Sequence, residues 1–180
     1  MTLRSRALPW LTVLLLSGAT AATAADDPPC TSAKWDVSQE HALFLKSPES
    51  IAAGHDIGSA PAMKARQLYE LTLAPQDGVK FILPPAKKGL SDGAFAGLMH
   101  FQVPVAGPYR VSLDQGLWID VVSNQKFVES TDFGGVSGCN APRKIVIYNL
   151  PAGQDLVLQL SGAAKDHARV TLTPVPPGGH

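Results

Sequence analysis

The chain has 180 residues with 15 Lys and Arg against 15 Asp and Glu, so its formal net charge is zero. Proteins that bind nucleic acid through its phosphates need clustered positive charge. The only local cluster here is Lys80, Lys87 and Lys88 in an expected loop, so no nucleic-acid partner is predicted.

The first 24 residues have the pattern of a secretory signal peptide. Arg4 and Arg6 precede the apolar run ALPWLTVLLL, and Ala22-Thr23-Ala24 supplies a small-x-small cleavage site. The alternative is a retained membrane anchor, but this run is shorter than the ~20 residues that span a bilayer, and no stable membrane insertion is predicted. Cleavage after Ala24 removes two arginines and leaves 13 basic against 15 acidic residues, a net charge of −2. We therefore expect a periplasmic or secreted protein.

The chain has two cysteines, Cys30 and Cys139. An exported protein lies in an oxidising compartment, so we expect a disulfide between them, and the alternative is two free thiols. On the chain-entropy model, a loop of this length stabilises by at most about 4.7 kcal/mol. The bond would fasten the N-terminal segment to the body of the protein.

After the signal peptide, residues 25–65 form an N-terminal segment and a Gly, Ala and Pro-rich connector. Within it, WDVSQEHALFLK predicts a short helix capped by Asp36 or Ser38. The residues of this helix expected to pack on the body are Leu43, Phe44 and Leu45.

Residues 66–173 consist of short alternating strands separated by Gly, Pro and Asn, with no long segment of helical period. RQLYELTLA and VKFIL predict a hairpin around PQDG, and PPAKKGLSDG predicts a loop. FAGLMHFQV alternates like a half-buried strand, and RKIVIYNL is apolar on both faces like a central strand. DLVLQL and ARVTLT form the last pair, with Leu156, Leu158, Leu160, Val170 and Leu172 facing inward and Asp155, Gln159, Arg169 and Thr171 facing outward. Residues 174–180 are too poor in apolar side chains to be ordered.

Eight or nine such strands cannot bury their faces in a single flat layer. The predicted fold class is therefore all-β, as a two-layer antiparallel β-sandwich of the jelly-roll or immunoglobulin-like kind, with a short N-terminal helix. A closed barrel is the alternative.

The most distinctive stretch is GPYRVSLDQGLWIDVV, residues 107–122. A two-residue loop in a hairpin here would leave the apolar residues of the second strand facing water. A three-residue loop over residues 114–116 pairs Val111 with Ile119 and joins the apolar faces, so we predict that register.

In this register Trp118 lies opposite Ser112 on the polar face, flanked by Arg110 and Asp120. One interpretation is that a loop or the N-terminal segment covers the indole ring. The other is that Trp118 is a stacking platform for a sugar ring or similar ligand, with its three polar neighbours supplying hydrogen bonds. These four residues are the candidate ligand-binding site.

The sequence contains no motif that predicts catalysis. The histidines at positions 41, 55, 100, 167 and 180 are isolated, and neither HExxH nor CxxC occurs. GGVSGC lacks the ending and the context of a nucleophile elbow. No catalytic residue, metal ligand or cofactor is predicted.

Five stretches spread over roughly residues 30 to 173 resemble a group of small exported bacterial proteins of unassigned function: WDVS, GLMHFQVPVAGPYRVSLDQGLWIDVV, STDF, GCNAPRK and LPAGQDLVLQLSG. Members of that group are sometimes labelled homogentisate 1,2-dioxygenase. That label implies iron held by two histidines and a glutamate in a much longer, cupin-type chain, and no matching spacing exists here, so no catalytic residue is carried over. More loosely, two of the strands are similar to those of pre-peptidase C-terminal and carbohydrate-binding β-sandwich domains, a resemblance that implies fold more than function.

The leading hypothesis is a periplasmic, non-catalytic β-sandwich that binds a glycan or a cell-envelope component. The second is a small metal-dependent enzyme in which scattered His and Asp side chains converge. A structural subunit of an envelope complex is the third.

Overall fold

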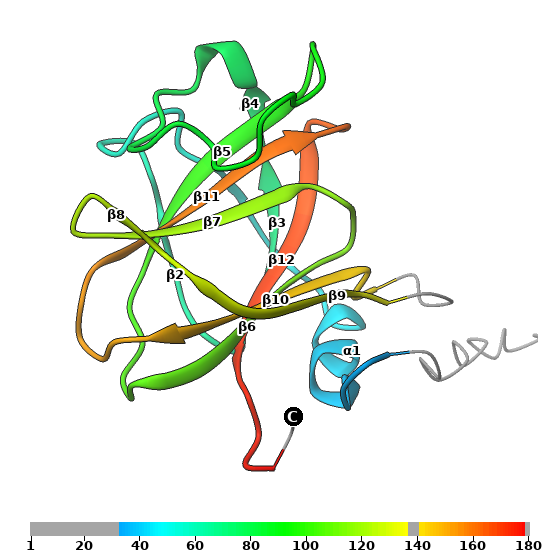
Figure 1. Ribbon diagram of the computed structural model, residues 1–180. Coiled ribbons are helices and arrows are strands. Elements are labelled where there is room, and N and C mark those ends of the chain that lie inside the picture. The colour runs from blue at the N-terminus through cyan, green and yellow to red at the C-terminus, as the bar shows by residue number, and fades with distance from the viewer. Residues whose placement is uncertain (1–32, 137–140, 179–180) are drawn as a thin grey trace, which may run out of the picture.

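The computed structural model describes residues 33–136 and 141–178. Two β-sheets pack face to face, and the short α-helix α1 lies against the strands near one end of the molecule (Figure 1). The signal peptide and both cysteines predicted to form a disulfide lie outside the described residues.

Each sheet has six strands. Sheet A has the order β1-β3-β12-β6-β10-β9, and sheet B has the order β2-β5-β11-β7-β8, with β4 also paired to β5. The strands of sheet A are β1 (Glu49–Ala52), β3 (Leu68–Thr72), β6 (Gly107–Leu113), β9 (Ser130–Gly135), β10 (Lys144–Leu150) and β12 (His167–Pro174). Those of sheet B are β2 (Ala62–Met63), β4 (Ala74–Pro75), β5 (Phe95–Phe101), β7 (Trp118–Ser123), β8 (Lys126–Val128) and β11 (Leu156–Ala163).

The predicted all-β sandwich is confirmed, with one correction to the strand directions. We expected antiparallel sheets, but both sheets are mixed, because β1 runs parallel to β3 and β2 runs parallel to β5. These two outer strands come from residues 49–63, a segment that we expected to be a connector. The sheets therefore begin earlier in the chain than the sequence indicated.

Two stretches of chain pass from one sheet into the other. β3, which pairs with β12 in sheet A, continues through Leu73 into β4, which pairs with β5 in sheet B. β8, which pairs with β7, continues through Glu129 into β9, which pairs with β10. The sandwich is thereby linked along both sides by continuous backbone.

The core lies between the sheets and is filled by alternate residues of the facing strands. β10 is apolar on both faces, as predicted, because its outer side is also covered: Ile145 and Ile147 pack there with Trp35 and Val37 of the N-terminal segment. The inner residues of the longest strands are Met99, Phe101, Tyr109, Val111, Leu113, Ile119, Val121, Val146, Tyr148, Leu156, Leu158, Leu160, Val170 and Leu172.

The predicted hairpin over residues 107–122 is wrong. β6 pairs with β12 and β10 in sheet A, whereas β7 pairs with β11 and β8 in sheet B. The apolar faces that contain Val111 and Ile119 do meet, but they meet across the core rather than side by side. Either arrangement buries the same residues, so the alternation of apolar residues alone does not separate a hairpin from an arch between sheets.

Two other predicted strand pairs are wrong. β11 and β12 lie in opposite sheets, although their inward and outward faces are as expected. The run VKFIL, residues 79–83, forms no strand, and β3 pairs instead with β1 and β12.

The predicted helix forms as α1 (Ser38–Phe44). Its N-cap is Val37 rather than the predicted Asp36 or Ser38, and the Val37 side chain makes no capping hydrogen bond. Asp36 Oδ1 instead accepts a hydrogen bond of 2.9 Å from Ser38 N at the start of the helix. Leu43 and Phe44 are buried as expected, but Leu45 is 65% exposed. Near the C-terminus, Val175 N donates a hydrogen bond to Pro108 O in β6. The first part of the segment expected to be a disordered tail, residues 174–180, is therefore bonded to sheet A.

Candidate functional site

The four candidate ligand-binding residues lie on opposite sides of the sandwich. Arg110 and Ser112 are on the outer face of sheet A, and Trp118 and Asp120 are on the outer face of sheet B, because their strands belong to different sheets. The expected pairings of Trp118 with Ser112 and of Arg110 with Asp120 are therefore wrong. The strand partner of Asp120 is Gln159.

Arg110 is a structural residue that holds α1 on sheet A. Its Nη1 donates to Asp36 O at 2.7 Å and to Glu40 Oε2 at 3.3 Å. Glu40 Oε1 in turn accepts a hydrogen bond from Thr173 Oγ1. Arg110, Glu40 and Ser112 are all fully buried. A ligand on the surface therefore does not reach the two candidate residues of this face.

On sheet B, Trp118 and Asp120 form a joined pair. Asp120 is 6% exposed, and its Oδ1 accepts a hydrogen bond of 2.9 Å from Trp118 Nε1. Its Oδ2 accepts a hydrogen bond of 3.1 Å from Ala86 N. Burial raises the pKa of the Asp120 carboxyl, while these two hydrogen bonds and the charge of Lys144 act in the opposite direction. Asp120 thus fixes the indole and also holds a loop against the sheet.

Two lysine side chains lie beside the indole ring. Lys144 Nζ is 5.1 Å and Lys87 Nζ is 5.9 Å from the ring centroid of Trp118, within cation–π range. Lys144 Nζ also donates to Leu117 O at 2.6 Å. Burial, followed by the charge of Lys87, lowers the pKa of Lys144, and the nearby Asp120 opposes this. Trp118 is therefore half-buried, with the loop that carries Lys87 forming part of its surroundings.

The outer face of sheet B is covered by residues 76–94, which contain no strand and only a short 3-10 helix, η1 (Gln76–Gly78). Gln159 on β11 is an anchor for this segment. Its Oε1 accepts hydrogen bonds from Ile82 N at 2.8 Å and Leu83 N at 3.3 Å, and its Nε2 donates to Leu83 O at 3.1 Å. Gln159 is 1% exposed, so a buried amide side chain satisfies backbone groups that have no strand partner.

Further contacts fasten both ends of the segment. Gln76 Oε1 accepts a hydrogen bond of 2.7 Å from Gly162 N. Leu90 packs so closely on Gly162 that a Cβ atom there would lie 2.7 Å from its Cδ2. Val79 is buried against apolar side chains of the sheet: Ala96, Leu98, Val122 and Val157.

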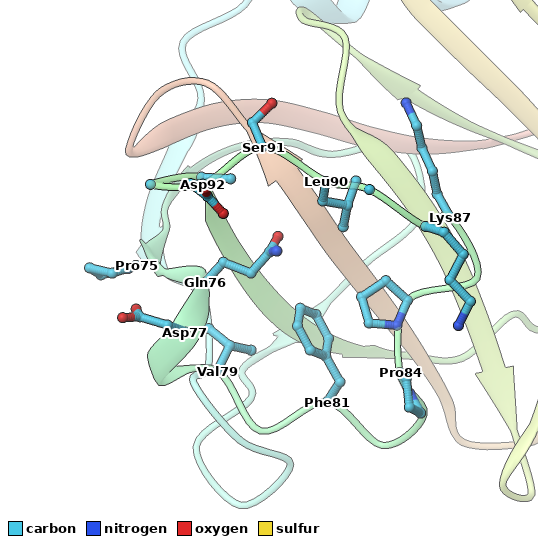
Figure 2. A pocket seen from close by; sticks show the side chains of 15 residues that line it. Pro75, Gln76, Asp77, Val79, Phe81, Pro84, Lys87, Leu90, Ser91 and Asp92 are labelled. Atoms are coloured by element: carbon cyan, nitrogen blue, oxygen red, sulfur yellow. The ribbon is translucent and has the colours of Figure 1, made fainter.

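A pocket of about 790 Å³ opens inside this segment (Figure 2). Figure 2 shows Phe81 and Leu90 between two ends of different character, with Asp77 and Asp92 at one end and Lys87 at the other. The lining residues are Pro75, Gln76, Asp77, Val79, Phe81, Pro84, Pro85, Lys87, Lys88, Gly89, Leu90, Ser91, Asp92, Gly93 and Ala94.

The histidines do not converge on a metal site in the part of the chain that the structure describes. Within residues 33–136 and 141–178, no group of three or more His, Cys, Asp or Glu residues has the geometry to hold a metal ion. Three histidines each contact one aspartate: His55 with Asp56, His100 with Asp155 and His167 with Asp166.

Among the described residues, no helix has the length and apolar character needed to cross a bilayer. No protein-family model matches the chain, and a search of the curated proteins finds no match. Function must therefore be argued from the site itself.

Gln159 and Phe81 are parts of the site that the sequence did not indicate. Gln159 was placed correctly on the outer face of its strand but was expected to face water. Phe81 was assigned to a strand. A single glutamine within the apolar run LVLQL was the available signal that something polar covers this face.

Proposed function

We propose that this protein is an exported, non-catalytic β-sandwich that binds a glycan or a similar polyhydroxylated component of the cell envelope. The ligand would occupy the pocket inside residues 76–94. The single observation that supports this most is the chemistry of the pocket lining.

The pocket is lined by both apolar side chains and hydrogen-bonding groups. Phe81, Pro84 and Leu90 offer an apolar surface suited to the C–H face of a sugar ring. Asp77 and Asp92 offer carboxylate oxygens, which accept hydrogen bonds from hydroxyl groups. An apolar surface with a few polar groups placed around it is typical of small-molecule binding sites.

The way the pocket is built also supports a binding role. Irregular segments of more than about 12–15 residues are uncommon in compact domains, and they are often functional. Residues 79–94 have no helix or strand, yet Gln159 and Asp120 hold the segment through four hydrogen bonds to its backbone. Binding residues carried on a loop that a rigid sheet positions are a common arrangement.

Export is supported by the N-terminal sequence pattern, with Arg4, Arg6, the apolar run and the small residues before Ala25. N-terminal sequencing of the protein from the periplasmic or culture fraction should give a chain that begins at Ala25. A chain in the cytoplasmic fraction that retains Met1 would contradict this part of the proposal.

The binding proposal is tested with purified, untagged mature protein and a panel of neutral and acidic oligosaccharides, by isothermal titration calorimetry. We expect at least one glycan to bind, and the double variant Asp77→Asn, Asp92→Asn to weaken its binding. Asp155→Asn is the matched control, since Asp155 is exposed. It directly precedes β11, whereas Gly162, which contacts the pocket segment, lies near the other end of that strand. Absence of binding across the panel would refute a glycan ligand, and stoichiometric metal in elemental analysis would favour the metal-dependent alternative.

A further inference from the structure

The pocket has a cationic end that continues onto the surface around Trp118. Lys87 belongs to both parts, because it lines the pocket and its Nζ is also 5.9 Å from the indole centroid. Lys144 approaches the same ring from β10, at 5.1 Å. Lys88 lines the pocket beside Lys87. Two ammonium groups, those of Lys87 and Lys144, thus lie beside one indole ring where the pocket meets the sheet.

The acidic groups in this region do not neutralise these lysines by direct contact. Within the described residues, neither Lys87 nor Lys144 makes an ion pair at 4.0 Å or less. Asp120 is close enough to influence Lys144, but both of its oxygens already accept hydrogen bonds. Glu129 is exposed and adds a second negative charge near Asp120.

The two lysines also act on each other. The charge of Lys87 disfavours the protonated form of Lys144, which is already partly desolvated. Two ammonium groups near the same indole ring repel each other, and no carboxylate contacts either of them. An anion that binds beside them would therefore stabilise both charges. Lys144 has one hydrogen bond to a backbone oxygen, and an ammonium group carries three donors, so it retains donors for a ligand.

We infer that Lys87 and Lys144, with the Trp118 ring between the loop and β10, form a subsite for the acidic group of a glycan whose sugar rings lie in the pocket. This inference rests on the proposed function and specifies its ligand as an acidic rather than a neutral glycan. The opposite end of the pocket carries Asp77 and Asp92, which repel an anion, so the acidic group is directed to the lysine end.

The test compares two ligands with the same sugar backbone, one anionic and one neutral: a hexasaccharide of galacturonic acid and its fully methyl-esterified form. Affinities are measured by calorimetry at low and at physiological salt for the wild type, Lys87→Gln, Lys144→Gln and the control Lys126→Gln. Lys126 is an exposed lysine on β8 of the same sheet. Inorganic phosphate alone is titrated as a free anion. Thermal unfolding of each variant checks that it folds. Because Lys87 is exposed, its substitution should not destabilise the fold, so Lys87→Gln tests the subsite even if Lys144→Gln is unstable.

We expect the acid form to bind about tenfold or more tightly than the ester, as one charge-assisted hydrogen bond provides. Lys87→Gln should remove most of that difference, Lys126→Gln should leave it, and added salt should reduce it. Equal affinity for the two forms would overturn the inference while leaving a glycan-binding function intact. If neither form binds but phosphate does, the site is one for a free anion, and the acidic-glycan inference fails. The inference also fails if the protein binds a different, neutral glycan but binds neither form of the hexasaccharide.

Discussion

The substitution Gln159→Leu tests whether the outer face of sheet B holds the pocket segment in place. It keeps a side chain of similar size at a position that is 1% exposed, but it removes three hydrogen bonds to Ile82 and Leu83. At about 1 kcal/mol per hydrogen bond, the segment loses roughly 3 kcal/mol of attachment. Because the segment lies on the surface, it can detach and become hydrated without unfolding the sheets.

The expected signature is therefore local. Amide hydrogen exchange at Ile82, Leu83 and Ala86 should accelerate by about a hundredfold, which is what roughly 3 kcal/mol corresponds to if these amides exchange by local opening. Exchange in the core strand β11 on either side of position 159 should change much less. Gln102→Leu is the matched control, since Gln102 is exposed and no hydrogen bond joins its side chain to the described residues. Unchanged protection of the Ile82, Leu83 and Ala86 amides in the Gln159→Leu protein would refute the assigned role of this glutamine.

Three further substitutions test the packing of the sandwich. Glu40→Leu removes the buried carboxylate of the Arg110–Glu40 ion pair and should reduce the free energy of unfolding in urea by about 3–5 kcal/mol; a loss below about 1 kcal/mol would contradict this. Gly97→Ala places a Cβ 2.4 Å from the Cβ of Ala53 and should destabilise by about 1–3 kcal/mol, with partial rescue by Ala53→Gly. Burial raises the pKa of Tyr148 above its ordinary value of about 10, so its ionisation opposes folding. The wild type should lose stability as the pH rises past about 10, and Tyr148→Phe should lose less; identical alkaline unfolding curves would count against it.

Local patterns in the sequence predicted the class of fold well. Alternation of apolar residues assigned the inner faces of the long strands correctly, and the run on β10 was identified as covered on both sides. The pairing of strands was predicted less well. Two strands bury the same residues whether they lie side by side in one sheet or face each other across the core, so the pattern of apolar residues does not separate the two arrangements. GPYRVSLDQGLWIDVV therefore contained the right faces but not the right partners.

The candidate site was predicted in part. Trp118 and Asp120 do lie together on one outer face, and a loop does form part of the surroundings of the indole. Arg110 was joined to them only through the predicted hairpin, and it lies instead beneath α1. Local pattern does not single out Phe81, because VKFIL is apolar enough for a strand, whereas its backbone bonds to Gln159, His55 and Gln76 in place of a neighbouring strand.

The two outer faces of the sandwich are covered in different ways, and the difference explains how the pocket on sheet B is built. A helix such as α1 satisfies most of its own backbone groups, so sheet A needs only a few side-chain contacts to hold it, chiefly the buried pair Arg110 and Glu40. An irregular segment has backbone N–H and C=O groups without partners, and the sheet beneath must supply them. Gln159 and Asp120 do this for residues 82–86. Since the sheet satisfies these groups, the segment can curve away from it and leave a pocket without secondary structure of its own. The shape of the pocket then depends on polar side chains of sheet B, which is why a change in a buried residue such as Gln159 should alter binding at a site that it does not line.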